Sequence, residues 1–167
     1  LEQHQISFDH LMSRVYLFHL EGATGYKKAT SANFGQRNYT LNQSNIMPQM
    51  SILWGTGSRF NLFYKAQNKR NIVGAQERLS QTTIGGLCNF NKTQKLSLTM
   101  EAKYIENKFV GIPYSAVAYT MLEGLQPGTN FTWSLLLQRQ ISSYLNLNLS
   151  YFGRQSSQGP VVHSGTV

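Results

Sequence analysis

Apolar and polar residues alternate along most of the chain after residue 45, and this alternation predicts long β-strands. It is plainest in residues 129–157, TNFTWSLLLQRQISSYLNLNLSYFGRQSS, where two alternating runs of similar length are separated by a short polar gap. A period of two places successive side chains on opposite faces of a strand. The segment is therefore predicted to form an antiparallel hairpin with one apolar and one polar face.

The same pattern recurs upstream as pairs of runs joined by turn-forming residues. Residues 45–55 and 58–68 flank a Gly-Thr-Gly turn, residues 78–91 and 95–109 flank a short polar link, and residues 114–125 lead through Gln-Pro-Gly to residues 129–140. Pro48 is expected near the start of its strand, where a missing N–H is tolerated. No segment shows the 3.6-residue period of a helix. We therefore predict antiparallel strands over 45–167.

Residues 1–44 form a less clearly defined region. The run SRVYLFHLEG at 13–22 is predicted to be a strand, and the stretch that follows it is predicted to hold one more strand and a long polar loop. The chain as a whole is expected to form a single domain.

Alternation assigns the side chains of the last two runs to two faces. Strands of about 9–11 residues span a bilayer when tilted, whereas strands of soluble sheets average about 5–6 residues. We therefore predict that the apolar set faces lipid and that the polar set faces an enclosed aqueous lumen. The predicted lipid-facing residues are Phe131, Trp133, Leu135, Leu137, Leu145, Leu147, Leu149 and Tyr151. The predicted lumen-facing residues are Asn130, Thr132, Ser134, Gln138, Asn146, Asn148 and Ser150.

The composition supports this assignment, because the polar faces are largely uncharged. Only 13% of the residues are charged, against about 25% in ordinary soluble domains. Aromatic residues lie toward the ends of runs, where a membrane protein carries its aromatic girdle; they are Trp54, Tyr104, Tyr119, Trp133, Tyr144 and Tyr151.

The net charge is +8, from 15 bases and 7 acids. The densest basic cluster, KAQNKR at 65–70, is expected at a solvated strand end or loop, with an anion or lipopolysaccharide contact as the alternative. No continuous run of Lys and Arg indicates nucleic acid, which is not expected as a partner.

Candidate catalytic residues are few. The four histidines show no metal-ligand spacing, and His163 has no acid or nucleophile with which to form a triad. Asp9 is the single aspartate, and Glu101 and Glu106 fall on opposite faces of one predicted strand, so that no carboxylate pair is expected. Cys88 is predicted to be a buried or lipid-facing small residue. We therefore expect no enzyme activity, no catalytic residue, no metal and no cofactor.

The termini carry no obvious targeting signal. No stretch is long and apolar enough for a transmembrane helix, and the first residues lack the pattern of a signal peptide. Since the chain also begins without Met, we expect a mature or internal piece of a longer protein.

One long segment of the chain resembles a known family. AYTMLEGLQPGTNFTWSLLLQRQISSYLNLNLSYFGRQSS, followed by VVHSGTV, resembles the C-terminal region of large outer-membrane proteins of the Bacteroidota type. That region has the form Y-x-M-L-E-G-L-x-P-G-x-N-x-x-W, then Q-R, then L-x-L-x-L-x-Y-x-G-R, then H-x-G. The resemblance implies an outer-membrane location and a barrel architecture without an assigned chemistry. Such families usually end on an aromatic residue, and this chain ends at Val167 instead.

These features together predict an all-β, antiparallel transmembrane β-barrel of about eight to ten strands that forms the C-terminal part of a larger barrel. The predicted function is the outer-membrane barrel wall of a transport or export complex. Expected partners are the lipid bilayer, lipopolysaccharide and other outer-membrane or periplasmic subunits.

Two alternatives stay open. A soluble β-sandwich that binds a ligand would bury Phe131, Trp133, Leu147 and Leu149 between two stacked sheets. A barrel-embedded hydrolase would need a Ser–His–acid cluster near one rim, and the sequence offers no such cluster.

Overall fold

A computed structural model describes residues 2–30, 38–55, 57–74, 76–92, 95–142, 144–157 and 159–167. Within these ranges the chain forms nine strands and one short helix. They are β1 (Glu2–Leu11), β2 (Tyr16–Ala29), β3 (Tyr39–Trp54), β4 (Ser58–Asn71), β5 (Arg78–Lys92), β6 (Leu96–Val110), α1 (Ala116–Leu122), β7 (Gly128–Gln140), β8 (Asn146–Ser156) and β9 (Val162–Thr166).

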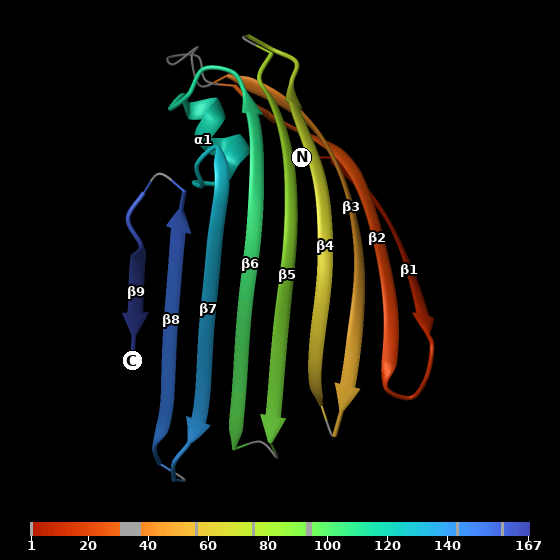
Figure 1. Ribbon diagram of the computed structural model, residues 1–167, viewed down its shortest axis with the longest axis vertical. Coiled ribbons are helices and arrows are strands. Elements are labelled where there is room, and N and C mark those ends of the chain that lie inside the picture. The colour runs from red at the N-terminus through yellow and green to blue at the C-terminus, as the bar shows by residue number, and fades with distance from the viewer. Residues whose placement is uncertain are drawn as a thin grey trace.

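All nine of these strands belong to one antiparallel sheet, and each strand pairs with its neighbours in the sequence, in the order β1 to β9 (Figure 1). The prediction of an all-β antiparallel fold is confirmed, and the strand number falls within the predicted range. The strands are long, from 13 to 16 residues in β2 to β7.

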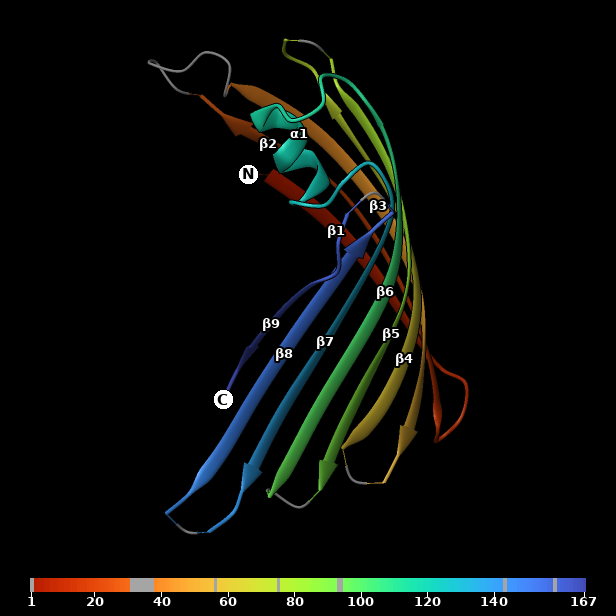
Figure 2. The ribbon, with the colours of Figure 1, turned by 60° about the vertical axis from the view of Figure 1, so that its left-hand side comes forward.

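The sheet is a single curved layer, and its two edges are β1 and β9 (Figure 2). Closure into a barrel needs a hydrogen-bonded ladder between the first and last strands. The described residues form no such ladder, so the structure shows an open antiparallel sheet and does not show the predicted barrel. Alternation along a sequence sets the two faces of a strand, but it does not encode which strands meet at the edges.

The start of β3 lies earlier than predicted. The strand begins at Tyr39, so that Pro48 lies in its interior instead of near its start. The β3–β4 ladder is interrupted at Met47 and Pro48 and resumes on both sides in the same register. The interruption follows from the missing N–H of proline, which removes one ladder hydrogen bond without shifting the strand.

Two complete strands lie in the region predicted to be less defined. β1 spans Glu2–Leu11, and β2 contains most of the strand predicted at 13–22 and extends to Ala29. The middle of the predicted polar loop, residues 31–37, lies outside the described residues.

The segment 114–125, predicted as a strand, instead contains α1. Ser115 caps the helix, since its side-chain oxygen accepts a hydrogen bond from the Ala118 N–H at 3.0 Å. Glu123 ends it in the left-handed conformation, with φ of 56°. The prediction was wrong because two helical turns are too short to show a 3.6-residue period, and small residues in this segment give an accidental alternation.

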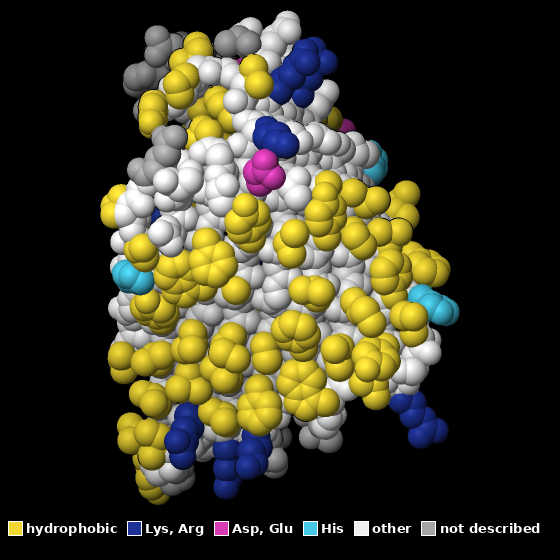
Figure 3. Space-filling view, viewed as in Figure 1, with side chains coloured by type: hydrophobic (Ala, Val, Ile, Leu, Met, Phe, Trp, Pro, Cys, Tyr) yellow, Lys and Arg dark blue, Asp and Glu magenta, His cyan; other side chains and the backbone are white. Residues whose placement is uncertain are grey.

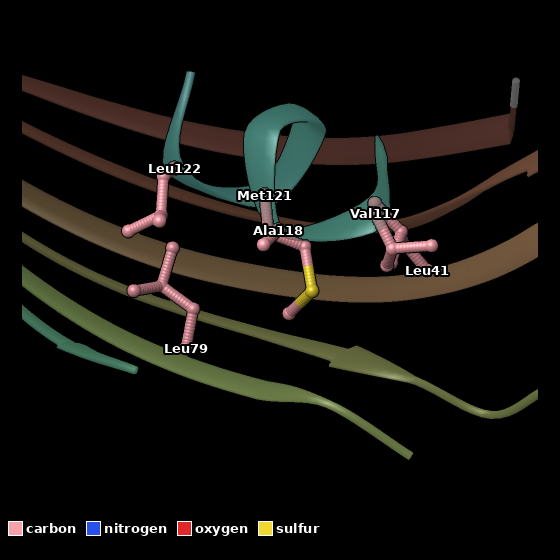
Figure 4. Packing of buried hydrophobic residues seen from close by; sticks show 6 residues of the cluster. All are labelled: Leu41, Leu79, Val117, Ala118, Met121 and Leu122. Carbon is pink, nitrogen blue, oxygen red and sulfur yellow. The ribbon is translucent and has the colours of Figure 1, made fainter. Parts of the chain in front are cut away.

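The small hydrophobic core lies where α1 meets the sheet. One face of the helix packs on Leu41 of β3 and Leu79 of β5 (Figure 4). The helix contributes Val117, Ala118, Met121 and Leu122, and Tyr39 and Phe109 complete the cluster. The concave face of the sheet is defined as the face that carries Leu41, Leu79 and α1, and the convex face is the opposite one. No helix in the described part of the chain is long and apolar enough to cross a membrane.

Candidate functional site

The candidate site is the convex face, where apolar side chains from many strands form a continuous belt (Figure 3). Neighbouring strands place these side chains directly opposite one another. One such row runs Phe60, Cys88, Met100, Leu135 and Tyr151 from β4 to β8. Much of the belt is uncovered: Leu62 is 54% exposed and Ile84 51%. We call this surface the apolar belt.

The apolar belt contains no Lys, Arg, Asp or Glu among the described residues, and charged rows bound it on both sides. At one margin Lys92, Leu96 and Arg139 lie in one row. At the other margin Glu106 lies beyond Tyr104 on β6. Leu96 and Glu106 are 10 residues apart on β6.

The height of the apolar belt follows from this spacing. Ten residues extend about 34 Å along a strand at ~3.4 Å per residue. At the tilt of about 35–45° found in transmembrane barrels, this length corresponds to a height of about 24–28 Å, close to the ~25 Å of their apolar band. Strands tilted by this amount would therefore give the apolar belt the height of such a band.

Seven of the eight predicted lipid-facing residues lie in the strands of this face. Phe131, Trp133, Leu135 and Leu137 alternate along β7, and Leu137 and Leu135 lie opposite Leu149 and Tyr151 of β8. Leu147 lies opposite Arg139, at the margin of the apolar belt.

Leu145 is the exception. It precedes β8 and lies in the β7–β8 turn, where its carbonyl accepts the Ile141 N–H at 2.9 Å. Contact of any of these residues with lipid stays a prediction.

The predicted lumen-facing residues all lie on the concave face. Their neighbours there are polar as well, and the groups bond one another across strands. Gln81 Nε2 donates to Asn107 Oδ1 at 2.8 Å, and the Thr99 hydroxyl donates to Asn89 Oδ1 at 3.0 Å. The Ser156 hydroxyl donates to Asn130 Oδ1 at 2.6 Å.

Some charged groups of the concave face are also paired. Glu101 and Lys103, which lie on the same face of β6, form an ion pair of 2.8 Å. Asp9 and His19 form a second contact of 2.7 Å between β1 and β2. Apolar side chains also occur on this face away from α1, among them Phe63, Leu87, Ile105, Leu136 and Phe152, so the separation of residue types is incomplete.

A buried lysine, which sequence reasoning missed, attaches α1 to the concave face. The ammonium group of Lys69 donates to the Met121 carbonyl at 2.9 Å and forms an ion pair with Glu123. The Lys69 side chain is 4% exposed and that of Glu123 is 60% exposed. The KAQNKR cluster was predicted at a solvated strand end. Lys69 instead points inward, because alternate residues of β4 face the concave side and Lys69 is one of them.

The segment after α1 is fixed by amides. Asn130 Nδ2 donates to the Gln126 carbonyl at 2.8 Å, and the Gln126 N–H donates to Asn130 Oδ1 at 3.2 Å. Together α1 and this segment cover one end of the concave trough. A hollow of about 490 Å³ lies there, lined by residues that include Gln49, Lys65 and Lys103.

The predicted aromatic girdle is only partly present. Trp54 and Tyr104 lie on the convex face toward the margins of the apolar belt, and Trp133 and Tyr151 lie in its middle rows. Tyr119 is on α1 and Tyr144 is in the β7–β8 turn. The indole of Trp133 lies over Gly153 of β8 and fills the space that a Cβ would take there.

His163 belongs to this aromatic cluster. Its Nδ1 lies 2.6 Å from the Tyr151 hydroxyl, and its ring stacks on Tyr151 with centroids 5.8 Å apart. Ser164 points to the opposite face of β9, where it lies opposite Phe152. In the described ranges no group of three or more His, Cys, Asp or Glu is placed to hold a metal ion.

Comparisons with known proteins add no assignment: no family model matches the chain, and no curated protein matches it. The resemblance to outer-membrane proteins of the Bacteroidota type stays a prediction.

Proposed function

We propose that this sheet forms part of the wall of an outer-membrane β-barrel in a transport or export complex. Its convex face contacts the hydrocarbon of the bilayer, and its concave face lines a water-filled interior. The observation that carries the proposal is the apolar belt, which is uncovered, free of Lys, Arg, Asp and Glu in the described residues, and of bilayer height.

The size of the apolar belt supports this proposal. It crosses seven strands, β2 to β8, so at about 4.8 Å per strand and ~25 Å in height its area is roughly 800 Å². The largest apolar patch of a typical soluble monomer is about 300–600 Å². A face of this size needs a cover, and hydrocarbon provides one along its whole length.

The soluble sandwich would cover the same face with a second sheet. The described residues form one sheet, and Phe131 is 41% exposed on its convex side. The opposite face here does carry charged residues, among them Arg59, Lys65 and the Glu101–Lys103 pair, but these lie among amides and hydroxyls, several of which bond one another across strands. Such a mixture suits the water-filled interior of a barrel.

The open edges β1 and β9 add a requirement. Unpaired N–H and C=O groups in hydrocarbon cost several kcal/mol each, so transmembrane sheets close on themselves. The proposal therefore includes further strands that pair with β1 and β9 and complete the barrel.

The membrane assignment is tested by refolding the protein that carries this chain together with the strands that complete its barrel, in three media: plain buffer, detergent micelles and phospholipid vesicles. We expect folded, protease-resistant protein only with detergent or vesicles. A monodisperse folded monomer in plain buffer would contradict the proposal and favour the soluble sandwich.

The transport assignment needs a separate test in the source cell. Deletion of the coding region should change the set of exported proteins or the uptake of solutes, and a tagged chain extracted in detergent should carry other envelope subunits with it. If export and uptake are both unchanged by the deletion, the transport role is wrong even if the membrane location is right.

A further inference from the structure

Two arginines face each other on the convex face just beyond the apolar belt. Arg70 of β4 and Arg78 of β5 are direct cross-strand partners. Like charges placed directly opposite each other destabilise a sheet. None of the ion pairs found among the described residues includes either arginine. Glu77 is adjacent to Arg78 but is turned inward, where its carboxylate accepts from Asn71 Nδ2 at 2.8 Å.

A third cation and several neutral polar groups lie beside this pair. Lys108 of β6 lies opposite Ser80, one row nearer to the apolar belt, and its side chain is 74% exposed. Its one ionic contact in the described structure is Glu106, at 3.5 Å. The same row contains Asn68 and Ser44.

These side chains line a shallow hollow of about 530 Å³, which we call the basic hollow. Figure 3 shows Lys and Arg side chains at this end of the convex face, above the apolar belt. The opposite margin differs, because Lys92 and Arg139, which share a row there, lie on strands that are not neighbours.

We infer that the basic hollow binds the phosphate of an anionic lipid whose acyl chains lie along the apolar belt. Guanidinium groups bind phosphate oxygens through paired N–H donors, and the ammonium of Lys108 adds a point charge. The hydroxyl of Ser80 and the amide of Asn68 supply neutral donors. A bound phosphate also removes the repulsion between Arg70 and Arg78.

The surroundings favour a lipid-borne phosphate over a free one. On the same face, the next row toward the middle of the sheet holds Ala66, Thr82 and Glu106, and the row after it holds Tyr64 and Ile84. Glu106 is paired with Lys108 on one side of this row, and the path from Arg70 and Arg78 to the apolar belt runs over Ala66 and Thr82. A phosphate held by the two arginines therefore lies at the level of the headgroups, with the apolar belt beyond that row for the chains. This inference rests on the proposed membrane location, and it adds a specific site on one side of the bilayer.

The test uses the protein that carries this chain together with the strands that complete its barrel, in detergent micelles, with bound lipids counted by native mass spectrometry. The probes are phosphatidic acid, diacylglycerol with the same acyl chains but no phosphate, and inorganic phosphate as a competitor. The variant is Arg70→Gln with Arg78→Gln. The control is Arg59→Gln with Lys65→Gln, which removes the same charge from the concave face of β4. Insertion of every protein into phosphatidylcholine vesicles is measured in parallel.

We expect the wild type and the control to bind phosphatidic acid and not diacylglycerol. The double arginine variant should lose at least about tenfold in affinity, because a hydrogen bond to a charged group contributes about a factor of ten or more. Undiminished binding of phosphatidic acid to that variant, or equal binding of diacylglycerol, would overturn the inference. Displacement by inorganic phosphate at equal concentration would show a site for free phosphate and overturn the lipid assignment. When one of these contradictory lipid-binding results is obtained and the wild type still inserts into vesicles, only the lipid site is refuted. When the wild type also fails to insert, the proposed membrane function is refuted as well.

Discussion

A charge placed at different depths on β7 and β8 probes the apolar belt most fully. Leu135 lies on the convex face, four residues from Arg139 at one margin and six from Thr129 at the other. Four residues correspond to about 14 Å along the strand and about 10–11 Å in height at a tilt of ~35–45°. Leu135 is therefore close to the middle of the apolar belt, whereas Leu147, opposite Arg139, is at its margin.

The account predicts a graded cost for arginine at these sites. Leu135→Arg should lower the free energy of unfolding in a bilayer by about 2–4 kcal/mol, and Leu147→Arg by about 0–1 kcal/mol. Ser134→Arg, which places the same charge on the adjacent position of the concave face, should be tolerated because that face is wet.

The assay is urea unfolding of the barrel that contains this chain and its closing strands, refolded into phospholipid vesicles and followed by protease resistance. The three variants add the same charge to the same hairpin of the same protein. Differences in their free energies of unfolding therefore depend on which face the residue occupies and how deep it lies. Equal losses at Leu135 and Ser134, or a larger loss at Ser134, would refute the assignment of the faces. Equal losses at Leu135 and Leu147 would be compatible with the assignment of the faces but would refute the different depths assigned to these two residues in the bilayer.

Three further substitutions test the packing. Gly153→Val should displace the Trp133 indole and destabilise the fold by about 1–3 kcal/mol in urea titrations; no change would mean that the contact is unimportant. Met121→Ala should open a cavity under α1, cost about 2–5 kcal/mol of docking and raise hydrogen exchange in the helix while the strands stay protected. Glu123→Gln should release α1 more than Lys69→Met does, because the former leaves a buried ammonium without its carboxylate and the latter leaves a carboxylate in solvent; the reverse order in hydrogen exchange would contradict this account of the ion pair.

The alternation of residue types predicted the faces of the sheet well, because each strand imposes a strict period of two. Asn130, Thr132 and Ser134 share one face of β7, and Phe131 and Trp133 share the other, as expected. Leu145 was placed on a strand because it continues the alternation of Leu147 and Leu149. Its backbone instead belongs to the turn, which periodicity alone does not locate.

The features that the sequence did not predict depend on contacts between distant segments. Lys69 and Glu123 are 54 residues apart, and their ion pair exists only because α1 folds back onto the concave face. The facing of Arg70 and Arg78 depends on the register of β4 and β5, which the turn between them sets. The distance of a residue from the charged margins likewise depends on how the strands pair, because the sequence alone does not distinguish Leu147 from Leu135.

Trp54 and Trp133, the only two tryptophans of the chain, both lie on the convex face, so quenching of their fluorescence by brominated acyl chains tests the central claim directly. The comparison protein carries Trp54→Phe and Trp133→Phe, with Phe152→Trp as its one tryptophan on the concave face. In vesicles of brominated phosphatidylcholine, we expect strong quenching of the wild type and weak quenching of the concave probe. Equal quenching of both proteins, or stronger quenching of the concave probe, would contradict the account.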